Sequence, residues 1–241
     1  MGSLTVSRNM KYSFIIPALN EERIIGRTIK SIKRQKGFFE IIVVDNGSTD
    51  KTGKVAKDLG CRVVKERQKG ISPARNKGAK IAKGEYVCFI DADGKLSENW
   101  LESIDNILKK KKVDVIVGAN VIEYENIFKK IWFNGYHFIS YLAVYFLKLF
   151  FNKIYFEGNN MAIRKDFLFK IGGFETVIVE GYWLSKKFRV AGGTSVFDPK
   201  IRIHYSSRGF DKAGYVKTIV YWTIAAIKKK KAINYSYKNK K

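Results

Sequence analysis

The sequence predicts an α/β fold: a mostly parallel sheet of the Rossmann-like kind with helices on both faces. Two observations lead to this expectation. Short runs rich in β-branched and aromatic residues alternate with helical patterns along the first half of the chain, which is typical of parallel sheets. The 241 residues are 46% hydrophobic and 28% charged, which excludes disorder for the bulk of the chain and allows a sizeable core.

The predicted elements follow one another at regular spacing. The first strand covers residues 12–17, and Asn20 is expected to cap a helix whose isoleucines between positions 24 and 32 share one face. Further strands are expected at residues 41–44, 61–64, 86–90, 113–117 and 158–163. Helices are expected after the turn at 45–50, from Ser72-Pro73 to Gly84, and from a cap at Ser97 to Leu108. Gly172-Gly173 ends another helix.

Three polar or turn-forming positions follow strand ends. Pro17, Asp45 and Asp91 all fall where strands of the predicted sheet finish. Ligands of open α/β sheets bind beyond the carboxyl ends of the strands. This edge is therefore the expected binding site.

Charge is the unusual property of the composition. There are 46 Lys and Arg against 22 Asp and Glu, a net charge of +24, and the residues from Gly181 onward contribute 15 basic against 2 acidic side chains. Such a surplus suits a polyanionic partner, which is a nucleic acid, an anionic membrane surface or a phosphorylated substrate. No nucleic-acid-binding motif accompanies the charge, so we expect no nucleic-acid partner, although a basic nucleic-acid-binding protein is the alternative reading.

Two carboxylates stand one residue apart in Asp91-Ala92-Asp93. In a turn both can approach one hard cation, and Mg²⁺ or Mn²⁺ prefers such oxygen ligands. The bland interpretation is a hydrophilic turn. Asp45-Asn46-Gly47-Ser48 also has two interpretations. An acidic side chain at a strand end can bind a base or ribose, or Asp and Ser can cap the next helix.

An aromatic segment and a basic tail follow the predicted sheet strands. Residues 128–156 contain 12 aromatic residues, and residues 215–227 show a helical apolar face that leads into four lysines. Aromatics and lysines beside an apolar stretch are typical of interfacial helices. We expect residues 127–156 to form an interfacial or acceptor-binding segment within a catalytic domain at 11–210, and residues 211–241 to form a basic amphipathic tail. The alternative is packing on the domain or a dimer contact.

The motifs together are more specific than any one of them. Their order is FIIPALNEE (14–22), IVVDNGSTD (42–50), ARNKG (74–78), GEYV (84–87), FIDAD (89–93), GNNMAIR (158–164) and IGGF (171–174). This set resembles family 2 glycosyltransferases with the GT-A fold, over about residues 12–210. The resemblance implies transfer of a sugar, with inversion, from a UDP- or GDP-linked donor to a membrane-associated acceptor such as a polyprenyl phosphate or a lipid-linked glycan.

The resemblance also implies roles for individual residues. Asp45 would contact the base, Arg75 would lie near the nucleotide and Asp91, and Arg208 would contact the phosphates. The full implied set for the nucleotide sugar is Pro17, Ala18, Leu19, Glu21, Asp45, Gly47, Arg75, Asp91, Ala92 and Arg208. Asp93 would ligate Mg²⁺ or Mn²⁺ together with Asp91, and His204 is a candidate third ligand, although an ordinary packed or surface histidine is the competing interpretation.

One position departs from the family pattern. Glu180-Gly181 stands where the family usually has Glu-Asp, and that aspartate is the expected general base. Either Glu180 takes the role, or the acceptor is already ionised, or the protein is a catalytically silent scaffold. We favour the ionised acceptor. Residues 1–10 lack the apolar core of a secretory signal, and two cysteines form no disulfide framework, so we expect a cytoplasmic protein peripheral at the inner membrane face.

Overall fold

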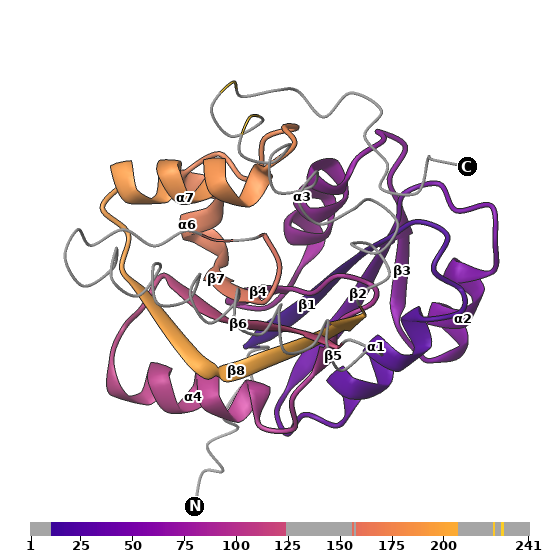
Figure 1. The fold of residues 1–241 in the computed structure, drawn as a ribbon, viewed down its shortest axis with the longest axis horizontal. Helices are drawn as coiled ribbons and strands as arrows, with labels where there is room; N and C mark the ends of the chain where they lie inside the picture. The colour runs from indigo at the N-terminus through magenta and orange to yellow at the C-terminus, as the bar shows by residue number, and fades with distance from the viewer. Residues whose placement is uncertain (1–10, 124–155, 157, 207–223, 225–227, 229–241) are drawn as a thin grey trace, which may run out of the picture.

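The computed structural model describes residues 11–123, 156, 158–206, 224 and 228 of the chain. In this part, eight strands form one sheet in the order β3-β2-β1-β4-β7-β6-β8-β5 (Figure 1). The strands are β1 (Tyr12–Ala18), β2 (Phe39–Asp45), β3 (Arg62–Lys65), β4 (Tyr86–Phe89), β5 (Lys95–Leu96), β6 (Val115–Glu123), β7 (Met161–Arg164) and β8 (Ser195–Ser206). The helices are α1 (Ile25–Lys33), α2 (Thr52–Asp58), α3 (Ile71–Ile81), α4 (Trp100–Lys110), α6 (Lys165–Lys170) and α7 (Glu180–Val190).

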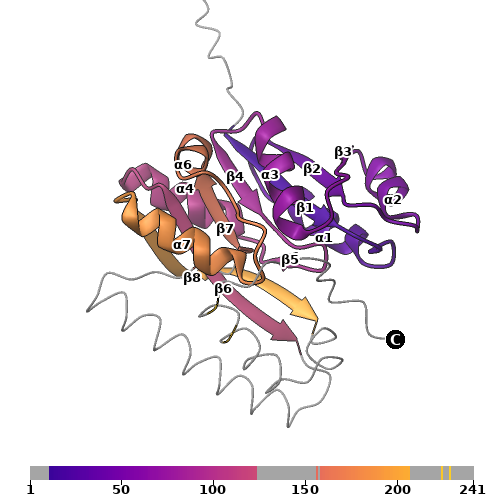
Figure 2. The ribbon, with the colours of Figure 1, turned by 90° about the horizontal axis from the view of Figure 1, so that it is seen from above.

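The first half of the sheet is parallel, as the sequence predicts. Strand β1 pairs in parallel with both β2 and β4, and β2 pairs in parallel with β3. Strand β7 runs antiparallel to both of its neighbours, β4 and β6, and β5 runs antiparallel to β8. Four of the seven strand pairs among the described residues are therefore parallel, the fourth being β6 with β8, which run side by side in Figure 2.

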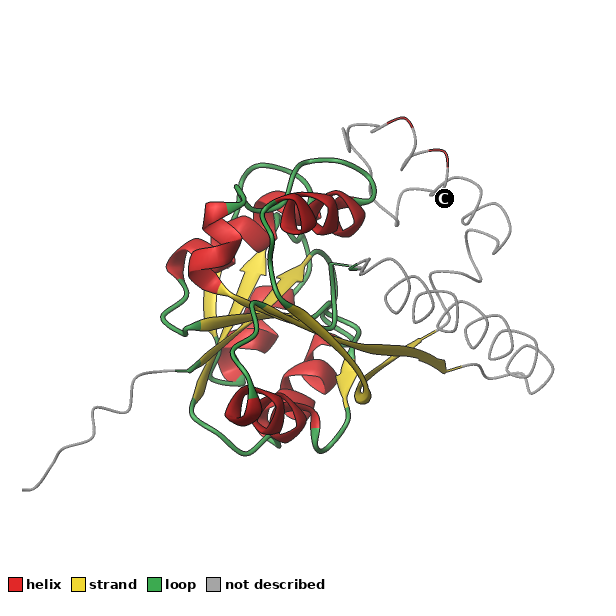
Figure 3. Ribbon diagram, turned by 90° about the vertical axis from the view of Figure 1, so that its left-hand side faces the viewer, coloured by secondary structure: helices red, strands yellow, loops and turns green. Residues whose placement is uncertain are grey.

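Helices cover both faces of the sheet, which explains why its central strands are apolar along their whole length. Tyr12, Phe14 and Ile16 of β1 join a core with α1, α2 and α4, whereas Ile15 joins a second core with α3, α6 and α7. Figure 3 shows the sheet between these two layers of helices. A strand buried on both sides needs apolar residues at successive positions, and this is the pattern of a parallel sheet.

Helix α3 begins at Ile71, so Ser72 lies inside the helix and is not the cap that was expected. Two further predicted helix caps, Asn20 and Ser97, are also wrong. Helix α1 begins at Ile25 without a side-chain cap, and Asn20 instead has a left-handed backbone (φ 55°) and accepts a hydrogen bond from the amide of Thr49 at 2.8 Å. Helix α4 likewise begins at Trp100 without a side-chain cap. The hydroxyl of Ser97 accepts a 3.4 Å hydrogen bond from the amide of Arg202 on β8. In both cases the side chain accepts a hydrogen bond from a residue distant in the sequence and not from the first turn of the helix that follows it.

Three elements were not expected from the sequence: β5, α7 and β8. Strand β8 contains Asp198 and Pro199, residues that indicate a turn when they are read locally. The pairing of β8 with β6 shifts at this point, because Gly118 faces Asp198 while the next residue, Ala119, faces Arg202. The turn-forming residues are thus accommodated in a bulge inside a long strand.

Several predicted features lie outside the described residues. These are the aromatic segment except for Phe156, the basic tail except for Ile224 and Lys228, and Arg208. Phe156 is buried, and its ring lies 5.1 Å from that of Phe188 on α7. Among the helices that are described, none has the length and apolar character needed to cross a bilayer.

Candidate active site at the carboxyl edge of the sheet

The candidate site lies where β1, β2 and β4 end. Asp45, the last residue of β2, pairs in register with Ala18, the last residue of β1. Asp91 follows β4 on the other side of β1. Neighbouring strands lie about 4.8 Å apart, so a ligand that reaches both carboxylates spans roughly 10 Å. That span suits an extended ligand such as a nucleotide better than a lone ion.

The loops after β1 and β2 are joined by backbone-to-side-chain hydrogen bonds. Three successive amides of the first loop donate to side chains of the second loop and of the first residue of α2. The pairs are Asn20 N to Ser48 Oγ (3.0 Å), Glu21 N to Thr52 Oγ1 (2.7 Å) and Glu22 N to Asp50 Oδ2 (3.1 Å). These hydrogen bonds fix the segment beside Asp45 that contains the predicted pocket residues Pro17, Ala18, Leu19 and Glu21.

Asp45 itself closes a turn and does not cap α2. Its Oδ1 accepts a 2.8 Å hydrogen bond from the amide of Ser48, whereas α2 begins later, at Thr52, with no side-chain cap. Gly47 lies inside this turn with φ 88°, a backbone conformation that glycine adopts without strain. Asp45 is only 8% exposed, and the hydrogen bond from Ser48 holds its carboxylate inside the turn.

Asp91-Ala92-Asp93 forms a turn, which is compatible with both sequence interpretations, the cation site and the plain hydrophilic turn. The amide of Gly94 donates to the carbonyl of Asp91 at 3.0 Å, which closes the turn. Ala92 is buried, and its carbonyl accepts a 2.7 Å hydrogen bond from the Thr28 hydroxyl on α1. The turn that carries both aspartates is thus fixed to the helix layer beneath it.

A buried arginine joins Asp91 to Glu180. Arg75, on α3, is 1% exposed; its Nη2 donates to Asp91 Oδ1 at 2.8 Å, and its Nη1 donates to Glu180 Oε1. The guanidinium carbon also lies 5.3 Å from the centre of the Phe174 ring. Gly158, with φ 75°, passes directly over this ion pair, because a Cβ there would lie 2.6 Å from Arg75 Nη1 and 2.8 Å from Glu180 Oε1.

The electrostatics of this trio follow from burial and mutual contact. Burial lowers the pKa of Arg75, but Asp91 and Glu180 raise it by more, so the guanidinium stays charged. Burial raises the pKa of Glu180 above its usual range, although Arg75 acts in the opposite direction. Glu180 is the first residue of α7, and its carboxylate contacts Arg75. The next residue, Gly181, has no side chain.

Asn159 and Asn160, which stand in the GNNMAIR motif, and Asn120, which the sequence analysis did not single out, complete the site. Asn159 Nδ2 donates to Asp91 Oδ2 at 3.2 Å, and Asn120 Nδ2 donates to Asn159 Oδ1 at 3.0 Å. Asn160 is fully buried and accepts a 2.8 Å hydrogen bond from the indole of Trp100. The sequence signal for Asn159 and Asn160 was the run GNN at 158–160, whereas Asn120 had no signal. The partners of this run come from β6, α4 and the turn after β4, which sequence spacing does not reveal.

His204 lies apart from the pattern that a three-ligand metal site would need. Its Nδ1 is 3.4 Å from Glu123 Oε1, and its backbone pairs with Lys95 on β5. Across the described ranges, no three His, Cys, Asp or Glu side chains are grouped closely enough to hold a metal. The donors that fit a hard cation here are the oxygens of Asp91 and Asp93, and Mg²⁺ commonly takes one or two carboxylates and completes its shell with substrate phosphates.

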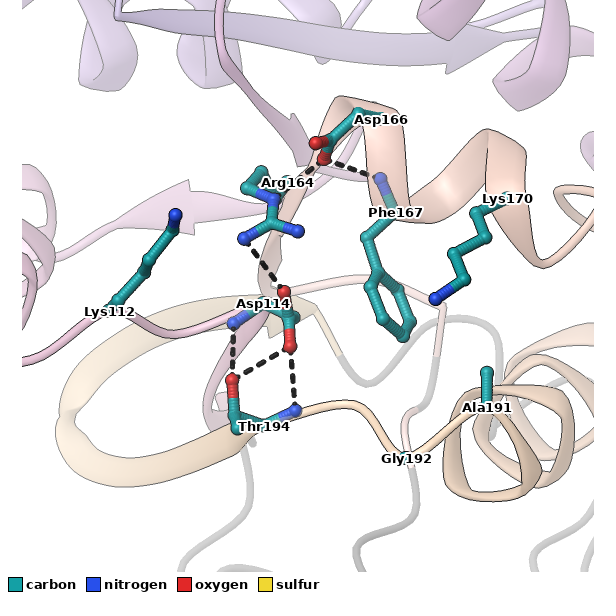
Figure 4. Close-up of a pocket in the computed structure, with 9 residues that line it drawn as sticks. All are labelled: Lys112, Asp114, Arg164, Asp166, Phe167, Lys170, Ala191, Gly192 and Thr194. Atoms are coloured by element: carbon teal, nitrogen blue, oxygen red, sulfur yellow. Dashed lines mark hydrogen bonds and ion pairs between the residues drawn. The ribbon is translucent and has the colours of Figure 1, made fainter.

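A pocket of about 580 Å³ lies at the opposite, amino-terminal edge of the sheet (Figure 4). Its central charges are paired with one another. Arg164 contacts both Asp166, at 2.6 Å, and Asp114, at 3.0 Å. The other oxygen of Asp114 accepts hydrogen bonds from the amide and the hydroxyl of Thr194. These contacts tie β6, β7 and β8 together, and the pocket is remote from Asp45 and Asp91.

Comparison with known proteins agrees with this geometry. The family model described as glycosyl transferase family 2 matches residues 13–182. Poly(ribitol-phosphate) beta-N-acetylglucosaminyltransferase TarP of Staphylococcus aureus is 34% identical over 122 residues, which are 47% of this chain and 37% of TarP. The chain spans between 32% and 56% of the length of the first three curated relatives that it matches.

Two solved structures have a similar fold. TarS of S. aureus, in complex with UDP-GlcNAc, is 18% identical with a TM-score of 0.65 over 82% of this chain and 58% of that one. The mannosyltransferase PcManGT of Pyrobaculum calidifontis, in complex with GDP-Man and Mn²⁺, is 20% identical with a TM-score of 0.71 over 91% of this chain and 63% of that one. These likenesses confirm the GT-A fold class expected from the sequence.

Proposed function

The chain belongs to glycosyl transferase family 2, and from this membership we propose that it transfers a sugar from a nucleoside diphosphate donor to an anionic, membrane-associated acceptor. The single observation that carries the proposal is the arrangement of Asp45 and Asp91 at one sheet edge, on either side of β1. Asp45 would bind the base. Arg75 would hold Asp91 beside the diphosphate, together with the residues that line the first loop.

A divalent cation fits the turn that carries Asp91 and Asp93. Both side chains offer carboxylate oxygens, which Mg²⁺ and Mn²⁺ prefer, and the turn is closed and anchored to α1. When bound there, the cation would act as a Lewis acid that stabilises the charge developing on the departing diphosphate. Arg208, which lies outside the described residues, is proposed to contact the same phosphates. His204 would be a third ligand only if its imidazole gave up the contact with the Glu123 carboxylate.

The start of α7 supports an acceptor that is already ionised. Gly181 has no side chain to take a proton, and the carboxylate of Glu180 is occupied by Arg75 in a buried ion pair. An acceptor phosphate needs no general base. One of its oxygens would attack the anomeric carbon, the bond from that carbon to the diphosphate would break, and the nucleoside diphosphate would leave with the electron pair. A single displacement of this kind inverts the configuration.

Polyprenyl phosphate is the acceptor that we propose first, and a lipid-linked glycan is the second candidate. TarP is named for transfer to a poly(ribitol-phosphate), a phosphate-bearing polymer, and its similarity to this chain supports the proposal of an anionic acceptor. The aromatic segment and the basic tail would place the enzyme at the cytoplasmic face of an anionic membrane, where each lysine contributes about 1 kcal/mol.

Donor binding tests the proposal. Thermal unfolding is followed with a panel of UDP- and GDP-linked sugars, with and without Mn²⁺, because a ligand that binds only the folded protein raises its melting temperature. We expect one donor to raise it only when Mn²⁺ is present, and Asp93→Asn to abolish this rise. Asp58→Asn, at an exposed position on α2, is the matched control.

The other function classes give different results in the same assays. A catalytically silent scaffold binds a donor but transfers no radiolabelled sugar to polyprenyl phosphate. A nucleic-acid-binding protein is retained on immobilised DNA in moderate salt and shows no donor-dependent shift, and this combination would overturn the proposal. Flotation with anionic liposomes tests the membrane association, and a protein that stays at the bottom of the gradient at low salt contradicts it.

A further inference from the structure

Three side chains form a directed chain of hydrogen bonds that ends on Asp91. Asn120 on β6 donates to Asn159 at 3.0 Å, and Asn159 donates to Asp91 Oδ2 at 3.2 Å. The two asparagines are separated by 39 positions in the sequence and meet only because β6 and β7 are neighbours in the sheet. Neither has a role in the function proposed above.

The charge of Asp91 dictates the direction of this chain. An ionised carboxylate only accepts hydrogen bonds, so the amide nitrogen of Asn159 must face it. The amide oxygen of Asn159 is then turned toward Asn120, which must present its own nitrogen. Each link therefore has one allowed orientation, and reversing either asparagine would place two acceptors together.

The backbone around Asn159 is fixed on both sides. Asn160 has a left-handed backbone (φ 46°), and its side chain also donates to the carbonyls of Ala119 (2.9 Å) and Ile201 (3.1 Å). Gly158 on the other side is packed against the Arg75–Glu180 pair. Asn159 is thus carried by a segment with little freedom to move, which is what a positioning group requires.

Arg75 and Asn159 hold different oxygens of the same carboxylate. Arg75 binds Oδ1 from α3, and Asn159 binds Oδ2 from the segment before β7. A carboxylate rotates readily about its last torsion, because that torsion has broad minima. Two donors from different elements stop this rotation and fix the direction of the acceptor sites that remain.

We propose that Asn159, held in orientation by Asn120, is a positioning residue that sets the plane of the Asp91 carboxylate for the donor diphosphate and its cation. The inference rests on the proposed function, because only that function gives Asp91 a donor diphosphate and a cation to bind. Groups that orient a ligating residue typically affect metal affinity or activity by 10–100-fold. Asn159 would act through Asp91 without touching the donor itself.

Mn²⁺ binding gives a readout that does not depend on turnover. The electron paramagnetic resonance signal of free Mn²⁺ is titrated with protein in the presence of GDP or UDP. We expect Asn159→Ala to weaken binding 10–100-fold and Asn159→Asp to weaken it further, since two carboxylates would then face each other. Asn106→Ala, at an exposed position on α4, is expected to match the unaltered protein.

A double-mutant cycle tests whether Asn120 acts through Asn159. We expect Asn120→Ala to weaken binding by less than Asn159→Ala, and the double variant to bind like Asn159→Ala alone. Losses that multiply would show that Asn120 acts by another route, and unchanged binding in Asn159→Ala would overturn the inference. Tighter binding in Asn159→Asp would also overturn it, because the position would then be a direct ligand.

Separate control measurements distinguish a failure of the positioning role from a loss of folding and from a failure of the proposed function. Thermal unfolding of each variant without ligand reports its stability, and Asn120→Ala and the isosteric Asn159→Asp test the inference if Asn159→Ala fails to fold. If the unaltered protein binds no Mn²⁺ with either nucleotide, the proposed function fails first. If it binds and the Asn159 variants match it, only the positioning role is wrong.

Discussion

The guanidinium of Arg75 lies 2.8 Å from Asp91 and, on its other side, contacts Glu180. Arg75 is 1% exposed and Glu180 is buried, so their ion pair is removed from solvent, whereas the Asp91 side chain is 28% exposed. The buried charges of Arg75 and Glu180 therefore depend on each other for compensation. Residues from α3, the turn after β4 and the start of α7 are thereby joined into one unit. The bridge connects the proposed donor site to the position where the family usually has its base.

Variants of Glu180 distinguish a positioning role from a base. Glutamine can still accept a hydrogen bond from Arg75 but cannot take a proton. We therefore expect Glu180→Gln to lower sugar transfer to polyprenyl phosphate by less than 10-fold in a radiolabel assay. Glu180→Ala leaves Arg75 Nη1 without its carboxylate and should cost about 3–5 kcal/mol of stability.

The control for this comparison is Glu102→Gln, at an exposed position on α4, which should leave transfer unchanged. A loss of three or more orders of magnitude in the turnover of Glu180→Gln, with normal donor binding, would identify Glu180 as the general base and contradict the ionised acceptor.

Stability should depend on pH through Glu180. Burial raises its pKa in the folded protein, so the folded state keeps the proton to a higher pH than the unfolded state, in which the pKa is about 4.3. This contribution to stability is complete below about pH 4.3 and is lost as the pH rises through the folded pKa. Glutamine stays neutral throughout.

Urea unfolding of the unaltered protein and of Glu180→Gln between about pH 4.5 and 8 measures this difference. We expect the free energy of unfolding of the unaltered protein, relative to that of the variant, to fall as the pH rises. A difference that increases with pH would mean that Arg75 outweighs burial and holds the pKa of Glu180 below its usual range.

Gly158→Ala should disrupt the bridge sterically. The added Cβ would lie 2.6 Å from Arg75 Nη1, and the positive φ adds a backbone cost of about 1–2 kcal/mol. Gly192 has a similar φ of 71°, yet nothing lies within 4 Å of a Cβ built there, so Gly192→Ala measures the backbone cost alone. We expect Gly158→Ala to lose more stability than Gly192→Ala in thermal unfolding, and to bind the donor more weakly. Equal losses would show that the ion pair adapts.

Asn160→Ala should be a severe folding variant. It removes the hydrogen bonds to the Trp100 indole and to the carbonyls of Ala119 and Ile201, all of them buried. Buried groups that lose their partners cost about 1–3 kcal/mol each, with partial relaxation, so we expect a total of about 2–4 kcal/mol by urea unfolding. The exposed Asn106→Ala should change stability by less than about 0.5 kcal/mol.

The elements with local signals were predictable. Strands β1, β2 and β4 are apolar runs that end at Pro17-Ala18, Asp45 and the Asp91 turn, and they lie together at one edge as expected. The turn form of Asp91-Ala92-Asp93 and the proximity of Arg75 to Asp91 were also expected from the motifs.

What the sequence missed depends on contacts between distant residues. Asn20 resembles a helix cap because asparagine caps helices well, but its side-chain oxygen instead accepts hydrogen bonds from the amide and the hydroxyl of Thr49. Strand β8 was hidden by Asp198 and Pro199, whose turn preference is satisfied in a bulge that only the pairing with β6 creates. The direction of β7 and the partners of Asn159 are set by strand order, which no single-sequence pattern encodes.

The pairing of β6 with β8 has a mechanical consequence. Glu123 and Ser206, the last residues of these parallel strands, are partners in register. The polypeptide therefore leaves the sheet twice from adjacent points, once toward the aromatic segment and once toward the basic tail. A displacement of the paired strand ends as a unit would move both exits together, so a force on either exit would act on the same corner of the sheet.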